Sequence, residues 1–78
     1  MPTFLDSHKM GNVTEEQLRQ AMKAPKDEYG VTNKNIYFNK AEDKAFCVLD
    51  APDKEAIQKH HQKIGLSCDS ITEVQSTA

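Results

Sequence analysis

One stretch in the second half of the chain constrains its fold more than any other feature. It begins with the apolar run Ala45–Leu49, turns at Ala51–Asp53 and continues as the helical pattern Lys54–Ile64, which Gly65 follows. An apolar run of this length is typical of a strand that is covered on both faces. Asp53 is a favourable helix N-cap, and glycine is the residue that most often ends a helix in the left-handed conformation. The stretch therefore predicts a buried strand that leads into an amphipathic helix.

The helical pattern has a buried side and a solvated side. Apolar and histidine side chains recur on one side at helical spacing, while charged and amide side chains cover the other. The residues predicted on the buried side are Ala56, Ile57, His60, His61 and Ile64. Two histidines therefore lie next to each other along the predicted helix.

The rest of the chain supplies a second helix and three further strands. Alternating apolar residues and turn residues mark the strands, and a capping box formed by Thr14 and Gln17 begins the helix. Pro25 ends that helix because it has no amide hydrogen to donate. The elements predicted outside the central stretch are a strand at Pro2–His8, a helix at Glu15–Ala24 and strands at Thr32–Asn39 and Ile71–Gln75.

This order of elements predicts an α+β fold on the ferredoxin-like βαββαβ plan. Two right-handed strand–helix–strand crossovers, with a hairpin between the middle strands, then give a four-stranded antiparallel sheet with both helices on one face. Counting strands along the chain, its order is 4-1-3-2. We expect residues 1–78 to form a single domain. Only 37% of its residues are hydrophobic, so the core is limited. We therefore expect a homodimer that covers the open face of the sheet.

Composition excludes several classes of protein. The net charge is -2 and basic residues form no run, so no nucleic-acid-binding surface is expected. No apolar stretch approaches the ~20 residues that a membrane-spanning helix needs, and the first residues lack the pattern of a secretory signal. Cys47 and Cys68 are therefore expected to be reduced thiols in a cytoplasmic protein.

The histidines are the first candidates for chemistry. His8 shares a strand face with Asp6, and a carboxylate beside an imidazole suits divalent metals such as nickel, zinc or cobalt. The same pair is also common as ordinary polar residues near a strand end. His60 and His61 point about 100° apart on a helix, so they do not chelate one ion together. A buried imidazole bonded to a backbone carbonyl is the alternative for one of them, and no strong zinc motif is present.

The two cysteines and Pro2 have simple structural interpretations beside the chemical ones. Cys47 lies within the central strand, where a small core residue is expected. Cys68 lies in a loop, and a metal site shared by the two thiols stays open. Pro2 would be an N-terminal secondary amine if Met1 were removed, as in the tautomerase superfamily, or it simply begins a strand.

Several short motifs, taken in their order and spacing, resemble a known family. The matching segments are Phe4–His8, Gly11–Leu18, Glu28–Val31, Phe46–Val48, Ala51–Ile57, His61, Gly65 and Asp69–Val74. With these segments, the chain resembles a family of small ferredoxin-like proteins, long classed as a domain of unknown function, that has a nickel-binding branch. The resemblance covers nearly the whole chain.

The resemblance implies a homodimer that binds metal largely through histidines. It implies His8 and His61 as metal ligands, Asp6 as a neighbouring carboxylate and nickel as the metal. The chain departs from the family pattern at two positions. Met22 stands where relatives often carry a histidine, and His60 stands where they tend to carry an aliphatic residue. A thioether is a poor donor for nickel(II), so one imidazole is lost and another is gained.

We therefore expect a small cytoplasmic, homodimeric metal-binding protein without catalytic activity. Its site would consist of His8, Asp6 and His61, completed by water or by the second chain. A second hypothesis is a small-molecule-binding protein or small enzyme of the dimeric α/β-barrel type, in which His8 or His61 is a general base. The cavity of such a protein, between sheet and helices, would be lined by Phe4, Tyr37 and Cys47. A purely structural or interaction role is a further hypothesis.

Overall fold

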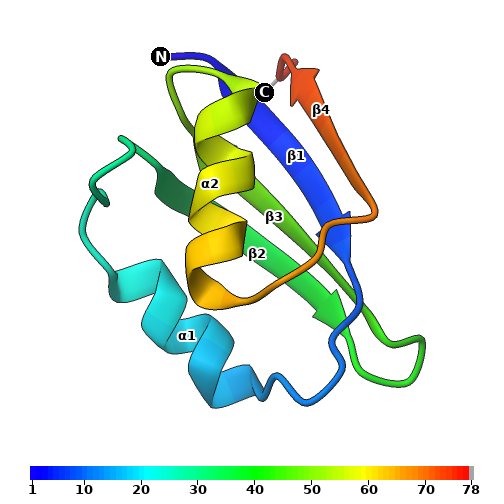
Figure 1. Cartoon of the computed structure of the whole chain (residues 1–78). Helices are drawn as coiled ribbons and strands as arrows, with labels where there is room; N and C mark the ends of the chain where they lie inside the picture. Colours follow the sequence, from blue (N-terminus) through cyan, green and yellow to red (C-terminus); the bar gives the residue numbers. More distant parts are fainter. Residues whose placement is uncertain (78) are drawn as a thin grey trace.

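The computed structural model describes residues 1–77 as one sheet with two helices (Figure 1). Its elements in chain order are β1 (Thr3–His8), α1 (Glu15–Lys23), β2 (Thr32–Asn39), β3 (Lys44–Asp50), α2 (Lys54–Ile64) and β4 (Ser70–Val74). The predicted order of helices and strands is confirmed, and each boundary agrees to within one residue. Neither helix in this part of the chain is long and apolar enough to cross a membrane.

The sheet is antiparallel throughout and has the order β2-β3-β1-β4. Read from its other edge, this is the predicted order 4-1-3-2, so the ferredoxin-like topology is confirmed. In the register of the central strands, Asp6 of β1 lies opposite Cys47 of β3 on one side and opposite Ile71 of β4 on the other. Asp6 therefore lies in the interior of the sheet, with a strand on each side.

Local hydrogen bonds explain where the helices begin and end. The hydroxyl of Thr14 accepts from the amide of Gln17 at 3.2 Å, and the Gln17 side chain accepts from the amide of Thr14 at 2.9 Å. The predicted capping box is therefore present at the start of α1. At the start of α2, the Asp53 carboxylate accepts from the amide of Ala56 at 2.8 Å. Gly65 ends α2 in the left-handed conformation, with φ of 76°.

Both helices pack on the same face of the sheet. From α1, Leu18 lies in a buried cluster with Ala45 of β3. From α2, Ala56 and Ile57 lie in a buried cluster with Leu49 of β3. Ala45 and Leu49 share one face of β3 because strand side chains alternate. The fold is therefore a two-layer α+β arrangement, and its core lies between the sheet and the helices (Figure 1).

Two details differ from the prediction. The side chains of β3 alternate between buried and partly exposed, so the single chain covers this strand on one face only. The apolar run is continuous because Phe46 and Val48 are also hydrophobic, although they lie on the outer face. Ile64, predicted on the buried side of α2, is 52% exposed and belongs to neither buried cluster. It lies in the last turn of the helix.

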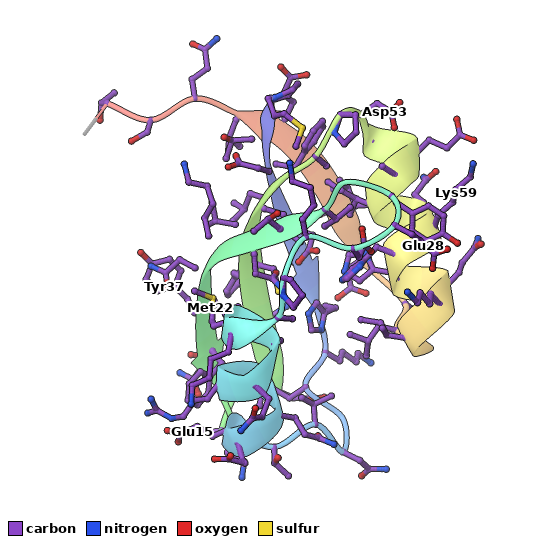
Figure 2. The ribbon with its side chains drawn as sticks, turned by 90° about the vertical axis from the view of Figure 1, so that its left-hand side faces the viewer. Glu15, Met22, Glu28, Tyr37, Asp53 and Lys59 are labelled. Atoms are coloured by element: carbon purple, nitrogen blue, oxygen red, sulfur yellow. The ribbon has the colours of Figure 1, made fainter. Side chains whose placement is uncertain are left out.

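The outer face of the sheet carries apolar and aromatic side chains with no helix above them. Leu5 of β1 lies opposite Val48 of β3 on this face, and Tyr37 of β2 lies opposite Phe46. Tyr37 is 59% exposed, and Figure 2 shows it projecting from the side of the sheet opposite α2. The outer face is thus partly apolar, whereas a sheet face that only meets solvent is usually polar.

Candidate metal centre

The buried face of β1 carries two ionisable side chains, Asp6 and His8. They follow Phe4 in the alternation of the strand, so all three are buried beneath the helices. Asp6 is fully buried and His8 is 2% exposed. An unpaired buried charge is costly, so such side chains need partners. The pair is therefore not a set of ordinary polar residues at a solvated strand end.

The Asp6 carboxylate has one satisfied oxygen and one unsatisfied oxygen. Its Oδ1 accepts a hydrogen bond from the backbone amide of Cys47 at 3.2 Å. Its Oδ2 lies 2.9 Å from Nε2 of His61, but this contact does not have the direction of a hydrogen bond. Among the described residues, Oδ2 has no hydrogen-bond donor. A buried carboxylate oxygen in this state favours a cation or a proton beside it.

His8 is held so that one ring nitrogen faces the interior. Its Nδ1 lies 3.0 Å from the carbonyl oxygen of Lys9. A carbonyl oxygen only accepts hydrogen bonds, so Nδ1 carries the ring hydrogen. Nε2 is then the nitrogen with a free lone pair, and it lies 3.6 Å from Sγ of Cys47. An imidazole oriented by a backbone carbonyl is a common arrangement among metal-binding histidines.

His61 reaches the same region from α2. It is 4% exposed, near the C-terminal end of the helix. Its Nε2 faces Asp6, and its Nδ1 lies 3.0 Å from Sγ of Cys68. The ring centroids of His8 and His61 are 6.1 Å apart. The fold thus brings the three predicted metal ligands, from β1 and α2, into one buried region.

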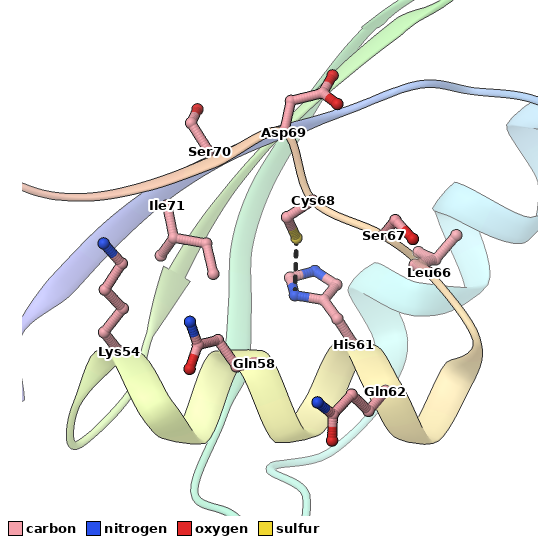
Figure 3. A pocket seen from close by; sticks show the side chains of 10 residues that line it. All are labelled: Lys54, Gln58, His61, Gln62, Leu66, Ser67, Cys68, Asp69, Ser70 and Ile71. Atoms are coloured by element: carbon pink, nitrogen blue, oxygen red, sulfur yellow. Dashed lines mark hydrogen bonds between the residues drawn. The ribbon is translucent and has the colours of Figure 1, made fainter.

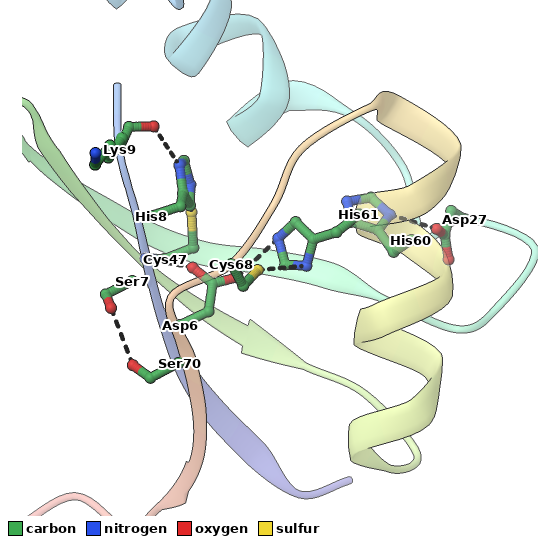
Figure 4. A network of polar contacts seen from close by, with 10 residues as sticks. All are labelled: Asp6, Ser7, His8, Lys9, Asp27, Cys47, His60, His61, Cys68 and Ser70. Atoms are coloured by element: carbon green, nitrogen blue, oxygen red, sulfur yellow. Dashed lines mark hydrogen bonds and ion pairs between the residues drawn. The ribbon is translucent and has the colours of Figure 1, made fainter. Parts of the chain in front are cut away.

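Two overlapping groups of candidate metal ligands result. In the inner cluster, which consists of Asp6, His8 and Cys47, all three residues are buried. In the outer cluster, which consists of Asp6, His61 and Cys68, the cysteine is only partly buried. In each cluster, one ligand atom from every residue lies within 4.8 Å of the others. The clusters meet at Asp6 (Figure 4).

Burial raises the pKa of both thiols. For Cys47, the nearby Asp6 carboxylate is the second cause of the raised pKa. For Cys68, burial and then the charges of Asp6 and Asp69 raise the pKa to about 12. Both thiols therefore hold their protons at neutral pH in the metal-free chain, and a bound cation must displace those protons.

The outer cluster borders a pocket of about 610 Å³. His61 and Cys68 form part of its wall, and most of the other lining side chains are polar, including Lys54 and Gln58 (Figure 3). Cys47 and His8 do not line this pocket. A path from solvent therefore leads to the outer cluster first. The polar wall is also unlike the apolar pocket that a small-molecule site usually has.

His60, the neighbour of His61, makes a separate contact, with the carboxylate of Asp27. Its Nδ1 lies 2.5 Å from Oδ2 of Asp27. The other oxygen of this carboxylate, Oδ1, accepts hydrogen bonds from the amides of Tyr29 and Val31. Burial acts to raise the pKa of Asp27, but the hydrogen bonds from Val31, His60 and Tyr29 outweigh it and lower that pKa. The prediction that the adjacent histidines diverge is confirmed.

The cavity predicted from Phe4, Tyr37 and Cys47 is wrong. Phe4 and Cys47 are core residues, whereas Tyr37 is exposed on the opposite side of the sheet (Figure 2). In the regular part of the register, Ile36 lies opposite Cys47 and Tyr37 lies opposite Phe46. Tyr37 therefore shares the outer face of the sheet with Phe46, while Cys47 lies on the buried face.

The cysteines are the candidate ligands that the sequence analysis did not include in the site. Their contacts join different elements, so no spacing along the chain links them to a histidine. The strand order carries one usable signal, because placing β1 beside β3 sets Asp6 opposite Cys47. No such signal exists for Cys68, whose position depends on the loop after α2. Met22, the position at which the resemblance implies a histidine, is 37% exposed and lies in neither cluster.

Comparison with known proteins supports this fold and the family resemblance that the sequence motifs indicate. Residues 4–74 match the family described as nickel responsive protein SCO4226-like. The chain belongs to this family. The crystal structure of SCO4226 from Streptomyces coelicolor A3(2) is similar with a TM-score of 0.80 and 30% sequence identity, over 97% of this chain and 99% of that chain. A comparison with curated proteins gave no match. The resemblance inferred from the sequence motifs is confirmed.

Proposed function

We propose that this chain is a homodimeric, non-catalytic metal-binding protein of the cytoplasm that binds a nickel-type divalent cation through Asp6, His8 and His61. The observation that carries the proposal is the buried Oδ2 of Asp6, which lacks a hydrogen-bond donor and lies 2.9 Å from a nitrogen of His61. A cation beside these groups would neutralise the carboxylate and use the lone pair of the imidazole.

The donor chemistry supports a transition metal over a hard cation. Imidazole nitrogen suits nickel, zinc and copper, whereas magnesium and calcium prefer sites built from oxygen. His8 adds a second imidazole, whose Nδ1 is held by the carbonyl of Lys9 and whose Nε2 carries the lone pair that faces Cys47. The family description, nickel responsive protein, supports nickel within this class of metals. Two free cysteines are in keeping with a reducing compartment.

The outer face of the sheet supports the proposed dimer. Leu5, Val48 and Tyr37 place apolar and aromatic area there, where a second copy could bury it. The metal ligands lie on the other face, beneath the helices, so a partner on the outer face does not reach them. The donor set is then completed by water or by this chain. Light scattering that shows a monomer at micromolar concentration would remove the dimer from the proposal.

Two measurements test the proposed metal binding. Elemental analysis of protein purified without a histidine tag identifies the metal that the chain carries. Calorimetric titration with nickel, zinc and cobalt then compares the wild type with His8→Ala and His61→Ala. Each variant should bind more weakly by more than about 10–100-fold, since that is the usual effect of losing even a residue that only orients a ligand.

His60→Ala is the matched control for this titration. It removes an imidazole from the same helix and from the residue next to His61, but one that pairs with Asp27 rather than with Asp6. Its metal affinity should equal that of the wild type. Unchanged affinity in both His8→Ala and His61→Ala would exclude these residues as ligands.

A further inference from the structure

The loop after α2 places Cys68 against the proposed metal ligands. Gly65 turns the chain at the end of the helix, and the amide of Leu66 donates to the carbonyl of His61 at 2.9 Å. Two residues past Ser67, the amide of Asp69 donates to the carbonyl of Ser7 on β1 at 2.7 Å. The segment is thus tied at one end to α2 and at the other to β1, and its fixed position holds Cys68 between them.

The side chain of Cys68 faces the proposed ligands. Its Sγ lies 3.0 Å from Nδ1 of His61, and it lies within 4.8 Å of the Asp6 carboxylate and of His61. The unsatisfied Oδ2 of the fully buried Asp6 is the independent sign that a positive charge fits here. One sulfur, one nitrogen and one oxygen from three separate elements therefore lie within 4.8 Å of one another. The sulfur is nearest Nδ1 of His61, and the carboxylate faces Nε2 of the same ring.

We propose that Cys68 is a metal ligand, so that the outer cluster is a carboxylate–imidazole–thiolate site, open to the pocket, for a borderline divalent cation such as nickel, zinc or cobalt. The inference rests on the proposed function, that the chain binds a metal. To Asp6 and His61 it adds a sulfur ligand and a direction of access, while His8 belongs to the inner cluster. On binding, the sulfur forms a bond to the cation, the thiol proton passes to solvent and the cation loses one water.

The sulfur ligand narrows the class of cation. Thiolate selects borderline and soft metals, while magnesium, calcium and manganese prefer oxygen donors. The pocket provides the access path that a binding site needs, because His61 and Cys68 both line its wall (Figure 3). Calcium and magnesium should therefore not compete with nickel at the outer cluster.

Cobalt(II) is the probe for the sulfur ligand, because thiolate bound to cobalt gives a ligand-to-metal charge-transfer band in the near ultraviolet. The wild-type cobalt complex should show this band, and Cys68→Ser should lose it. Ser67→Ala is the matched control from the same loop, and it should keep the band at full intensity. A band that survives unchanged in Cys68→Ser, or that disappears only in Cys47→Ser, would overturn the inference.

The outcomes separate the inference from the proposed function. Cobalt that binds by calorimetry without any thiolate band would overturn the role of Cys68 and leave the metal-binding function intact. Failure of cobalt and nickel to bind the wild type would overturn both.

Alkylation of Cys68 tests the inference in the wild type, without a variant. Nickel at about 100 times its Kd leaves about one site in a hundred free, so it should slow the modification of Cys68 about a hundredfold. Equal rates with and without bound nickel would overturn the inference.

Discussion

The inner and outer clusters contain the same kinds of donor but differ in access to solvent. Each has one histidine, one cysteine and the shared carboxylate of Asp6. Cys47 lies in the core on a central strand, whereas Cys68 lies in a loop at the wall of a pocket. The comparison indicates that burial, and not donor identity, distinguishes candidate ligands enclosed in the core from candidate ligands that solvent can reach.

Removing the shared carboxylate should have the largest effect, because it disrupts both clusters. Asp6→Ala leaves His61 without its anionic neighbour and removes the carboxylate oxygen that accepts from the buried amide of Cys47. The free energy of unfolding should fall by about 3 kcal/mol, and nickel binding should be lost. Urea unfolding and calorimetric titration measure the two effects.

Asp6→Asn is the control for the shape of this side chain. An amide oxygen can still accept from the Cys47 amide, so this variant should recover part of the lost stability but not the metal affinity. Nickel affinity that is unchanged in both variants would show that neither cluster binds the metal.

Metal binding should stabilise the folded chain by the next largest amount. Nickel at about 100 times its Kd should add about 2.7 kcal/mol. For a domain of this size, that raises Tm by about 10–20 °C. A chelator in excess should reverse the shift. Differential scanning calorimetry measures it, and at equal nickel concentration Cys68→Ser should show a smaller shift than the wild type if the outer cluster binds the ion.

The contact between His60 and Asp27 lies near the two clusters but contains no proposed metal ligand, so it can be compared with them. Asp27→Asn should lower the free energy of unfolding at pH 7 by about 1–2 kcal/mol, because hydrogen bonds to a charged acceptor are lost. The folded-state pKa of Asp27 is lowered from 3.8, so its contribution is present above that value and is lost as pH falls through the folded-state pKa.

The difference in stability between the wild type and Asp27→Asn should therefore narrow below about pH 4. Urea unfolding between pH 7 and pH 3 measures it, and nickel affinity at pH 7 should match that of the wild type. A difference that stays constant down to pH 3 would contradict the lowered pKa.

Replacing either cysteine should have the smallest effect on the free energy of unfolding. The two thiols should nevertheless differ clearly in their rates of alkylation. Cys47→Ala should lower the free energy of unfolding by about 1 kcal/mol, because it leaves a small cavity in the core. Cys68→Ala should change it by less than about 0.5 kcal/mol. In the folded, metal-free chain, an alkylating reagent should modify Cys68 first and Cys47 only after unfolding. Equal rates of modification would contradict the difference in access, and peptide mass spectrometry distinguishes the two thiols.

Much of the fold was predictable because its signals are local. The Thr14 capping box and the Gly65 helix end act through neighbouring backbone groups, so they can be identified without knowing the tertiary structure. The strand order followed because right-handed crossovers and a central hairpin leave few arrangements. The exposure of Ile64 and Tyr37 was not predictable, since it depends on where the core ends and on which face of the sheet the helices cover.

By itself, the sequence determined which side chains share a face. Asp6 and His8 lie with Phe4 because a strand alternates, and His60 diverges from His61 because a helix rotates between successive residues. Only the tertiary structure decided that Asp6 and His61 meet Cys68. These contacts join a strand, a helix and a loop, whose relative positions depend on how the whole core packs rather than on any pattern along the chain.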